Sequence, residues 1–475
     1  MVNDEIKYRI RQSLGFPPTA EQEQAISVFA DFMADRDSRT VMILRGSAGT
    51  GKTTLAGAVV RALNSLKQKL VLLAPTGRAA KVFSLYAGSA AYTIHRRIYR
   101  QKTAGDLSAF NLNVNLQRDT LFIIDEASMI ANQGLGESAF GSGCLLDDLV
   151  EFVYSTDQNC RMLLIGDPAQ LPPVGEDESP ALSAAMLRAY GMTVYETSLH
   201  EVLRQSQESG ILYNATAIRQ MPVPILPRIR FSGFPDIKVV PGDELIESLA
   251  TSYSRAGLDD TIVITRSNKR ANIYNQGIRR TVLDREEELC RGDRLMIVKN
   301  NYYWLMVEGG GLKENSTFLA NGDIATVQRI RNVHEQYGFR FAEVTLQFPD
   351  YDDYELTATV LLDTLASEAP SLTREQQQQL YDRVMEDYAD IPLKADRLKK
   401  LKQDRYYNAL QVKFAYAVTC HKAQGGQWSH VYIDQGYMTD DMLTPEYLHW
   451  LYTAFTRATD RLFLVNWPKT QVDEG

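Results

Sequence analysis

Short apolar runs alternate with longer helical patterns along the first part of the chain. Five such runs lie at residues 40–44, 70–74, 121–124, 162–165 and 193–196, and most of them are short, rich in strand-forming residues and nearly continuously apolar. Nearly continuous apolar strands are typical of parallel sheets that helices cover on both faces. The pattern therefore predicts an α/β fold that begins with a parallel sheet.

The pattern changes after a proline-rich stretch at residues 222–227. A strand at 261–265 and a helix around 268–280 indicate a second α/β unit. Beyond Gly292 the chain turns to short strands separated by Gly and Asn turns, at 294–298, 324–330 and 341–347. This later stretch predicts a small β-barrel.

Residues 371–410 are polar and are expected to be helical. They include a basic cluster of Arg397, Lys399, Lys400 and Lys402, whose simplest interpretation is a solvated helix face. The α/β pattern returns from Val412. The barrel and the helical stretch are therefore expected to interrupt the second α/β unit.

The composition, with 44% hydrophobic and 23% charged residues, is that of an ordinary folded protein. Its 475 residues exceed what a single core usually serves, so two core domains are expected. No apolar run approaches the roughly 18 residues that span a bilayer, and residues 1–12 are charged rather than signal-like. We therefore expect a cytoplasmic protein with no membrane partner. The cysteines, at 144, 160, 290 and 420, form no C-x-x-C pair for zinc, and free buried thiols are expected.

The net charge of -8 argues at first sight against a nucleic-acid partner, because phosphate binding normally leaves a basic footprint. Acidic residues can nevertheless cover the outer surface while a local basic groove binds a strand. The net charge therefore does not decide the question.

The strongest chemical signal is a glycine-rich loop between the strand at 40–44 and the helical run at 54–66. It consists of Gly46, Ser47, Ala48, Gly49, Thr50, Gly51, Lys52 and Thr53, and Thr54 follows it. The backbone N–H groups of such a loop cradle phosphates, the lysine neutralises their charge and the final hydroxyl binds Mg²⁺. The loop predicts a site for a nucleoside triphosphate.

Two strand ends supply the other groups that hydrolysis needs. The strand at 121–124 is followed by Asp125, placed for the Mg²⁺ shell, and by Glu126, placed for the general base. The next strand leads to Gln170, which we expect at the same sheet edge as a γ-phosphate sensor. Paired acids after a strand also occur at ordinary helix N-termini, but the neighbouring phosphate loop favours the catalytic interpretation.

These motifs and their order resemble superfamily 1 helicases of the RecD/Dda branch, over about residues 16–465. The resemblance implies two RecA-like parallel-sheet P-loop domains, the second carrying an SH3-like β-barrel and a helical insertion. The expected limits are a first domain at 1–203 with a pin insertion at about 98–117, a second domain at 204–291 plus 411–475, and the insertion at 292–410.

Further motifs extend the resemblance to residues that would contact the adenine base of the nucleotide and the DNA strand. Phe16, Thr19 and Gln22 resemble an adenine-reading element, which implies Gln22 as the base contact. The implied DNA contacts come from segments at 74–81, 93–95 and 418–425, and are Pro75, Thr76, Thr93, His95, Thr419, His421 and Lys422, while Gly425 is implied to touch the nucleotide. In the pin segment, Phe110 is the conspicuous apolar tip candidate, and it either stacks on a base or fills a gap in the core.

The final motif, residues 452–457, resembles one that carries an arginine finger, which implies that role for Arg457. Arg204 is implied as a second γ-phosphate contact. The resemblance thus implies that Mg-ATP closes a cleft between two domains, that hydrolysis reopens it, and that the protein moves 5′ to 3′ on single-stranded DNA up to duplex junctions. We expect it to function as a monomer.

Three alternatives stay open. An RNA helicase of the same superfamily would keep the same ATP site, and a nucleotide-dependent switch would bind ATP without unwinding. A helicase-nuclease is disfavoured because the chain ends soon after Arg457. At residues 265–268, a strand contact and an ordinary helix cap are equally compatible with the sequence.

Overall fold

The computed structural model describes residues 2–103, 106–134, 141–156, 158–201, 208–222, 225–307 and 319–473. Its first large unit is a six-stranded sheet in the order β3-β2-β6-β7-β1-β8, with every neighbouring pair parallel. The strands are β1 (Thr40–Gly46), β2 (Lys69–Ala74), β3 (Ala91–Thr93), β6 (Thr120–Ile124), β7 (Arg161–Gly166) and β8 (Thr193–Leu199). All five strands predicted from the apolar runs are confirmed, while β3 is too short to leave such a pattern.

Helices cover both faces of this first sheet, which explains why β1, β2, β6 and β7 are mostly apolar. Successive side chains of β1 alternate between two cores: Met42 packs in one, whereas Val41 and Ile43 pack in the other. The first core is covered by α1 (Val2–Leu14), α2 (Ala20–Ala34), α3 (Lys52–Ser65) and α4 (Gly77–Ala87), and the second by α5 (Ile94–Ile98), α6 (Leu145–Tyr154) and α7 (Ala184–Ala189).

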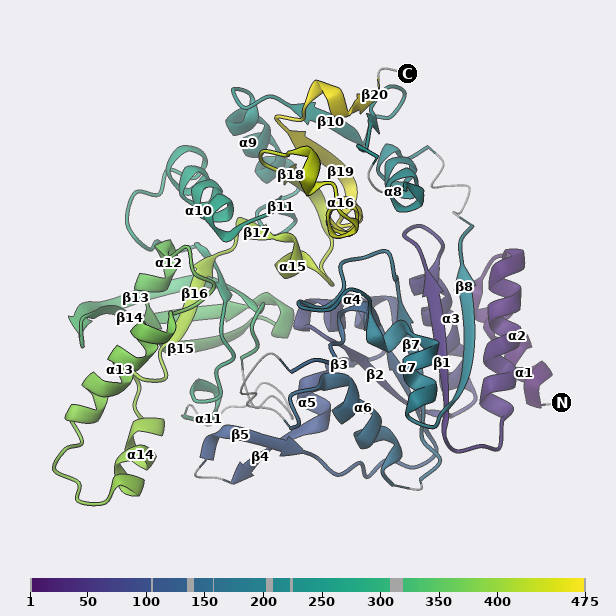
Figure 1. Ribbon diagram of the computed structural model, residues 1–475, viewed down its shortest axis with the longest axis horizontal. Helices are drawn as coiled ribbons and strands as arrows, with labels where there is room; N and C mark the ends of the chain where they lie inside the picture. Colours follow the sequence, from purple (N-terminus) through teal and green to yellow (C-terminus); the bar gives the residue numbers. More distant parts are fainter. Residues whose placement is uncertain are drawn as a thin grey trace.

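A second parallel sheet has the strand order β10-β19-β18-β11-β17. Its strands are β10 (Ile237–Val240), β11 (Thr261–Thr265), β17 (Ala417–Thr419), β18 (Trp428–Asp434) and β19 (Ala458–Val465). Its helices are α8 (Gly210–Gln220), α9 (Leu245–Arg255), α10 (Asn268–Gly277), α15 (Cys420–Ala423) and α16 (Pro445–Phe455). Figure 1 shows this unit above the first sheet, so that the chain forms two α/β units as predicted.

The predicted barrel is present as a closed set of five strands. They are β12 (Arg294–Ile297), β13 (Ile324–Gln336), β14 (Phe339–Phe348), β15 (Tyr354–Leu361) and β16 (Leu410–Phe414). Three short helices, α12 (Asp363–Ala366), α13 (Arg374–Glu386) and α14 (Lys394–Lys402), separate β15 from β16 and lie at the left of Figure 1. The strand that closes the barrel therefore lies beyond the polar helical stretch.

The barrel passes directly into the second sheet, because two residues separate β16 from β17. The buried Asn275 of α10 holds this junction through both ends of its amide. Its Nδ2 donates to the carbonyls of Phe414 and Ala417, at 3.1 and 2.9 Å, and its Oδ1 accepts from the backbone N–H groups of Tyr416 and Ala417, at 3.0 and 2.7 Å. The barrel is thereby fastened to the second α/β unit.

The smaller elements complete the described fold. A hairpin of β4 (Tyr99–Thr103) and β5 (Asp106–Leu112) lies in the segment expected to form a pin, and it is antiparallel. Further short elements are α11 (Trp304–Val307), β9 (Ile229–Arg230), β20 (Val472–Asp473) and several single-turn helices.

Within the described ranges, no helix is both long and apolar enough to cross a bilayer. All four cysteines are unpaired. Cys160 and Cys420 are buried as expected, whereas Cys144 and Cys290 remain partly accessible because they lie at a helix start and in a turn.

Candidate nucleotide and nucleic-acid sites

The glycine-rich loop joins β1 to the N-terminus of α3, where the sequence places it. Gly51 precedes the helix with φ of +81°, a conformation that residues with a Cβ rarely adopt. A Cβ at Gly46 would lie 2.7 Å from Lys52 Cγ, so a glycine is needed for the lysine to fold over the loop. Lys52 Nζ donates to the Ser47 carbonyl at 2.9 Å. Lysine and helix N-terminus thus converge on one point, which fits a phosphate chain.

Gln22, implied as the adenine contact, braces the same loop from α2. Its Oε1 accepts from the Thr19 backbone N–H at 3.1 Å in a capping box, and its Nε2 donates to the Thr50 carbonyl at 3.4 Å. The side chain is 1% exposed. Its amide therefore supports the loop in this conformation, and the contact with adenine stays a prediction.

The two acids lie at the end of β6, beside the phosphate loop. Glu126 adopts a left-handed conformation with φ of +52°, and its N–H donates to Asp125 Oδ1 at 2.9 Å. Burial, followed by the neighbouring Glu126 charge, raises the pKa of Asp125 to about 7, and Lys52 opposes this shift. A carboxylate whose pKa is raised in this way fits a site for a divalent cation. Mg²⁺ prefers oxygen ligands, which the Asp125 carboxylate and the partly exposed Thr53 side chain can supply.

Gln170 lies in the turn after β7 and is 6% exposed. Its Oε1 is buried and has no hydrogen-bond partner in the part of the chain that the structure describes. A buried amide oxygen without a partner is costly unless a ligand or water satisfies it. The position therefore fits a contact with a bound nucleotide or with the attacking water.

The second α/β unit docks on this edge of the first sheet through α16. Tyr452 Oη accepts from the Ala48 backbone N–H at 2.9 Å and donates to Asp167 Oδ2. The neighbouring Thr453 Oγ1 accepts from the Leu171 backbone N–H at 2.8 Å. One helix of the second unit is thus bonded to the phosphate loop and to the loop that carries Gln170.

Arg457, the implied finger, is 2% exposed and lies just after α16. Its Nε donates to the Thr453 carbonyl, its Nη1 to the Gly426 carbonyl and its Nη2 to Thr456 Oγ1, each at 3.1 Å. All three acceptors belong to the second unit. The structure therefore does not bring Arg457 onto the phosphate loop, and Arg204 lies outside the described residues.

Among the described residues of the second unit, two without an assigned role hydrogen-bond to the phosphate loop. One is Tyr452, the first residue of the final motif, and the other is Arg219 at the end of α8. Arg219 Nη1 donates to Ser47 Oγ. The sequence offers no signal for Arg219, because an arginine in the last turn of a helix is ordinary.

The predicted strand-binding motifs meet across the same interface. Gly425, with φ of +72°, lies so close to α4 that a Cβ there would be 3.0 Å from Ala79 Cβ and 3.1 Å from Thr76 Oγ1. Thr76 caps α4 by accepting from the Ala79 N–H at 3.2 Å, and Pro75 precedes it. Arg78 Nη2 donates to the Gln427 carbonyl at 2.6 Å. The segment at 74–81 therefore packs against the segment at 418–425.

Thr419, His421 and Lys422 line a cavity beside α10, β17 and the barrel. Lys413 and residues 266–268 line it as well. Burial lowers the pKa of Lys413 and of Lys422, each to about 8, and it also lowers the pKa of His421. Ser267 caps α10, with its Oγ accepting from the Arg270 N–H at 3.2 Å. The cap interpretation of this turn is confirmed, and the turn also faces the cavity.

The remaining implied strand contacts lie near the hairpin. Thr93 is buried and caps α5 by accepting from the Arg96 N–H at 3.4 Å. Burial lowers the pKa of His95 to about 4, so this imidazole is neutral at pH 7. The backbone of Phe110 belongs to β5, while its side chain lies outside the described residues.

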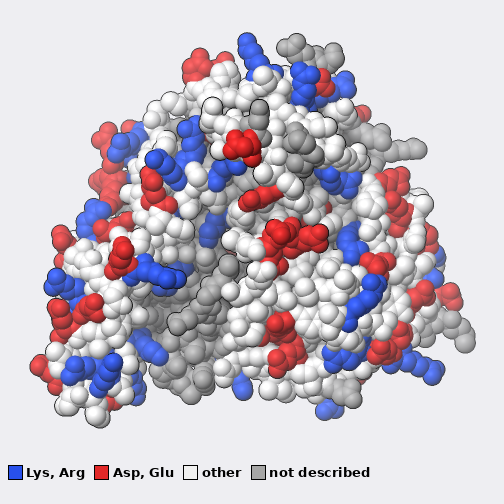
Figure 2. All heavy atoms as spheres, viewed as in Figure 1, with Lys and Arg blue, Asp and Glu red and all other residues white. Residues whose placement is uncertain are grey.

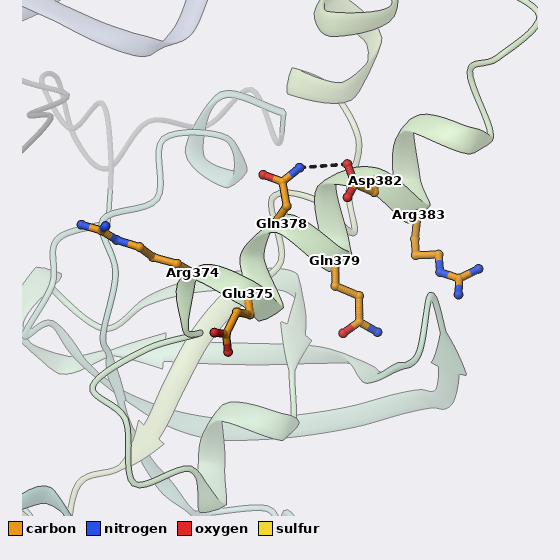
Figure 3. Close-up of a pocket in the computed structure, with 6 residues that line it drawn as sticks. All are labelled: Arg374, Glu375, Gln378, Gln379, Asp382 and Arg383. Atoms are coloured by element: carbon orange, nitrogen blue, oxygen red, sulfur yellow. Dashed lines mark hydrogen bonds between the residues drawn. The ribbon is translucent and has the colours of Figure 1, made fainter.

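The acidic residues of the chain are not gathered on one visible part of the surface. Figure 2 shows acidic and basic side chains interspersed over the visible face, so the net charge is spread widely. A separate hollow follows α13, and Figure 3 shows its lining side chains spreading from that one helix: Arg374, Glu375, Gln378, Gln379, Asp382 and Arg383. Gln378 Nε2 donates to Asp382 Oδ1 at 2.8 Å within the helix. This hollow has no part in the nucleotide site.

Two family models match the chain, in the order expected from its motifs. Residues 19–223 match an AAA domain, and residues 414–465 match a UvrD-like helicase C-terminal domain. The first match contains the phosphate loop, Asp125 and Gln170, while the second contains Thr419, Gly425 and Arg457.

The chain is also similar to curated helicases. It is 23% identical over 431 residues to the ATP-dependent RecD2 DNA helicase of Deinococcus radiodurans, covering 89% of this chain and 46% of that protein. It is 23% identical over 364 residues to the ATP-dependent DNA helicase dda of phage T4, covering 71% of this chain and 75% of that protein. The chain therefore spans slightly less than half the length of the Deinococcus relative.

Among solved structures, the Pif1 helicase from Bacteroides in complex with ADP-AlF3 and ssDNA aligns with a TM-score of 0.48 and 16% identity, covering 97% of this chain and 95% of that one. The two family matches, the two relatives and the ordered motifs agree in one respect: this chain is similar to superfamily 1 helicases of the RecD/Dda type.

Proposed function

We propose that this chain is an ATP-dependent DNA helicase, which binds single-stranded DNA and unwinds duplexes in the 5′-to-3′ direction. The observation that carries the proposal is that one interface joins both sets of motifs. Tyr452 connects the second unit to the phosphate loop through Ala48, and Gly425 packs against Thr76. A change at the nucleotide is thereby linked to groups expected to grip a strand.

ATP would place its phosphates on the loop at 46–53, where Lys52 neutralises the β and γ charges. Thr53 and Asp125 would hold Mg²⁺, which adds positive charge beside the phosphates. Glu126 is proposed to accept the proton of the attacking water, and Gln170 to orient that water or contact the γ-phosphate. The orphaned Oε1 of Gln170 supports this part of the proposal.

Arg457 and Arg204 are proposed to reach the γ-phosphate when the interface closes further. Arg457 must then exchange the carbonyls of Gly426 and Thr453 for phosphate oxygens. Such an exchange would tie closure to the presence of ATP, and loss of the γ-phosphate would release it. Alternating grip by the two units would turn each hydrolysis into a step along the strand.

The names of the two curated relatives support DNA as the substrate, and the resemblance to the RecD/Dda branch supports 5′-to-3′ movement. The β4–β5 hairpin is proposed as the pin that separates the strands, with Phe110 in its second strand. We propose that the protein acts as a monomer in the cytoplasm, on single-stranded DNA next to duplex junctions.

The test is strand separation on four duplexes that carry a 5′ or a 3′ single-stranded tail of DNA or RNA, with a blunt duplex as control. We expect Mg-ATP to support opening of the DNA duplex with the 5′ tail and of no other. Opening from the 3′ tail alone would reverse the proposed direction. Opening on RNA tails would favour an RNA helicase, and ATP hydrolysis without any strand separation would favour a switch.

A further inference from the structure

We infer that Arg219 is a catalytic cation of the ATP site, which contacts the γ-phosphate from the second α/β unit. The inference rests on the proposed ATPase function and adds a residue to it. Arg219 Nη1 donates to Ser47 Oγ, and Ser47 belongs to the phosphate loop. Among the described residues of the second unit, Arg219 is the arginine with a hydrogen bond to this loop.

The position of Arg219 follows from the way α8 is built. Ser209 caps the helix, and Asp236 anchors its start by accepting from Ser209 Oγ at 2.6 Å and from the Gly210 N–H at 2.9 Å. Ile211, Ala215 and Ile218 are buried in the core shared with α16. Residue 219 lies one turn beyond Ala215 and therefore on the same side of the helix. The packing of α8 thus directs Arg219 toward the interface.

The guanidinium retains bonding capacity at this position. Arg219 Nε is buried and finds no hydrogen-bond partner among the residues described. Its neighbour Tyr452 accepts from the Ala48 N–H, one residue along the loop from Ser47. Burial and Asp167 raise the pKa of the Tyr452 hydroxyl, while the Arg219 charge acts in the opposite direction. The cation therefore lies within electrostatic reach of the amide groups that receive phosphates.

The chemistry needs a cation at this point. In hydrolysis, the water oxygen bonds to the γ-phosphorus while the bond from that phosphorus to the β–γ bridging oxygen breaks. The water proton passes to Glu126, and ADP retains the electron pair on the bridging oxygen. Charge then gathers on the γ-phosphoryl oxygens and the bridging oxygen, which a fixed guanidinium stabilises. In contact with Ser47, Arg219 approaches these oxygens without a large movement of α8.

The first experiment measures nucleotide binding. We compare the wild type with Arg219→Ala, Arg219→Lys and the control Arg255→Ala, an exposed arginine in the last turn of α9. Calorimetry gives the Kd for Mg-bound β,γ-imido-ATP and for Mg-ADP. Arg219→Ala should weaken binding of the ATP analogue by about tenfold or more, because a charge-assisted hydrogen bond is lost. Binding of ADP should change less than about twofold, because ADP lacks the γ-phosphate, and Arg219→Lys should fall between.

The second experiment measures hydrolysis stimulated by single-stranded DNA. Arg219→Ala should lower kcat by about 10²-fold or more, as removal of a single preorganised donor does in other active sites. Equal weakening of both nucleotides, or no weakening of either, would overturn the inference and leave Arg219 as a link between the units. If the wild type and Arg255→Ala themselves fail to hydrolyse ATP, the proposed function fails instead. The two results are therefore distinguishable.

Discussion

Two regions of the second α/β unit satisfy their polar groups differently. The nucleotide side is the region that contacts the loop at 46–53. The strand side is the cavity lined by Thr419, His421 and Lys422. On the nucleotide side, Tyr452 and Thr453 hydrogen-bond to Ala48, Asp167 and Leu171 of the first unit. These bonds connect backbone or buried groups in fixed positions. Movement of one unit must therefore move the phosphate loop and the Gln170 turn of the other.

On the strand side, two lysines that line the cavity have neutral partners. Lys422 Nζ donates to Asn321 Oδ1, and Lys413 Nζ donates to the carbonyls of Thr364 and Ser367. Within the described ranges neither lysine forms an ion pair, and burial lowers the pKa of both. The comparison indicates that the nucleotide side is already hydrogen-bonded to the first unit. On the strand side, the charges of Lys413 and Lys422 are not neutralised by an acidic partner among the described residues, so they are available to a phosphate backbone.

The largest expected effect on activity comes from a substitution on the nucleotide side. Lys52→Ala should abolish ATP hydrolysis and strand separation, because its ammonium group is placed to neutralise the phosphates. Binding of single-stranded DNA without nucleotide should stay nearly intact, since Lys52 faces the loop. Fluorescence anisotropy with a labelled oligonucleotide measures the second quantity.

Lys69→Ala is the matched control, because Lys69 is an exposed residue at the start of β2. Near-normal turnover by Lys52→Ala would exclude the assigned phosphate site. Loss of DNA binding without nucleotide would show that the two sides are less separate than the structure indicates.

The next effect concerns Arg457, which lies near the nucleotide side but donates its hydrogen bonds to groups of the second unit and not to the phosphate loop. If it acts as a finger, Arg457→Ala should lower kcat by about 10³-fold while ATP affinity changes little. Because the side chain also satisfies buried carbonyls, the same variant should lose about 1–3 kcal/mol of unfolding free energy. Steady-state kinetics and urea unfolding separate the two roles, and lower stability with normal kcat would make Arg457 structural.

A smaller effect, on the strand side, is a dependence of affinity on pH. The pKa of Lys422, lowered by burial to about 8, means that its amine is charged at pH 7 and mostly neutral at pH 9. The affinity for single-stranded DNA should therefore fall about tenfold between these pH values if one such amine must be protonated. Burial also lowers the pKa of His421, which moves its titration further from this pH range.

Lys422→Arg provides the control for this effect, because a guanidinium stays charged at pH 9. The variant should retain affinity at pH 7 and show a flatter pH profile in the same titration. An unchanged profile would mean that Lys422 does not meet a phosphate.

The smallest effect is on the response to salt. Binding of single-stranded DNA should weaken with salt, with a log-log slope of about -0.7 for each phosphate contacted. Lys422→Ala should reduce the steepness by about one such contact. A flat response in the wild type would show that basic side chains do not contact the phosphates of the strand.

The sequence predicts best where function depends on local spacing. The loop at 46–53, Asp125 and Gln170 each follow a strand whose apolar pattern is clear, so their meeting at one sheet edge could be anticipated. The barrel could be anticipated only in part, because β16 pairs with β15 across the intervening helices α12 to α14. Long-range pairing of this kind leaves no local pattern.

Contacts between units were beyond prediction for the same reason. Arg219 and Ser47 are 172 residues apart, and neither α8 nor its last turn carries an unusual composition. The side-chain directions of Gln22 and Arg457 likewise depend on neighbours that the motifs do not name. A motif therefore specifies which residue types are present, and tertiary packing decides where their polar atoms point.

The hydrogen bonds of Asn275 have a mechanical consequence. Four hydrogen bonds from one buried amide hold the two-residue junction between β16 and β17. A hinge at that point would have to break several of them at once, and Asn275 is buried, so the lost bonds would be costly. The barrel should consequently act as a stiff lever on the second sheet, so that a small rotation at the nucleotide becomes a larger displacement at the barrel's far end.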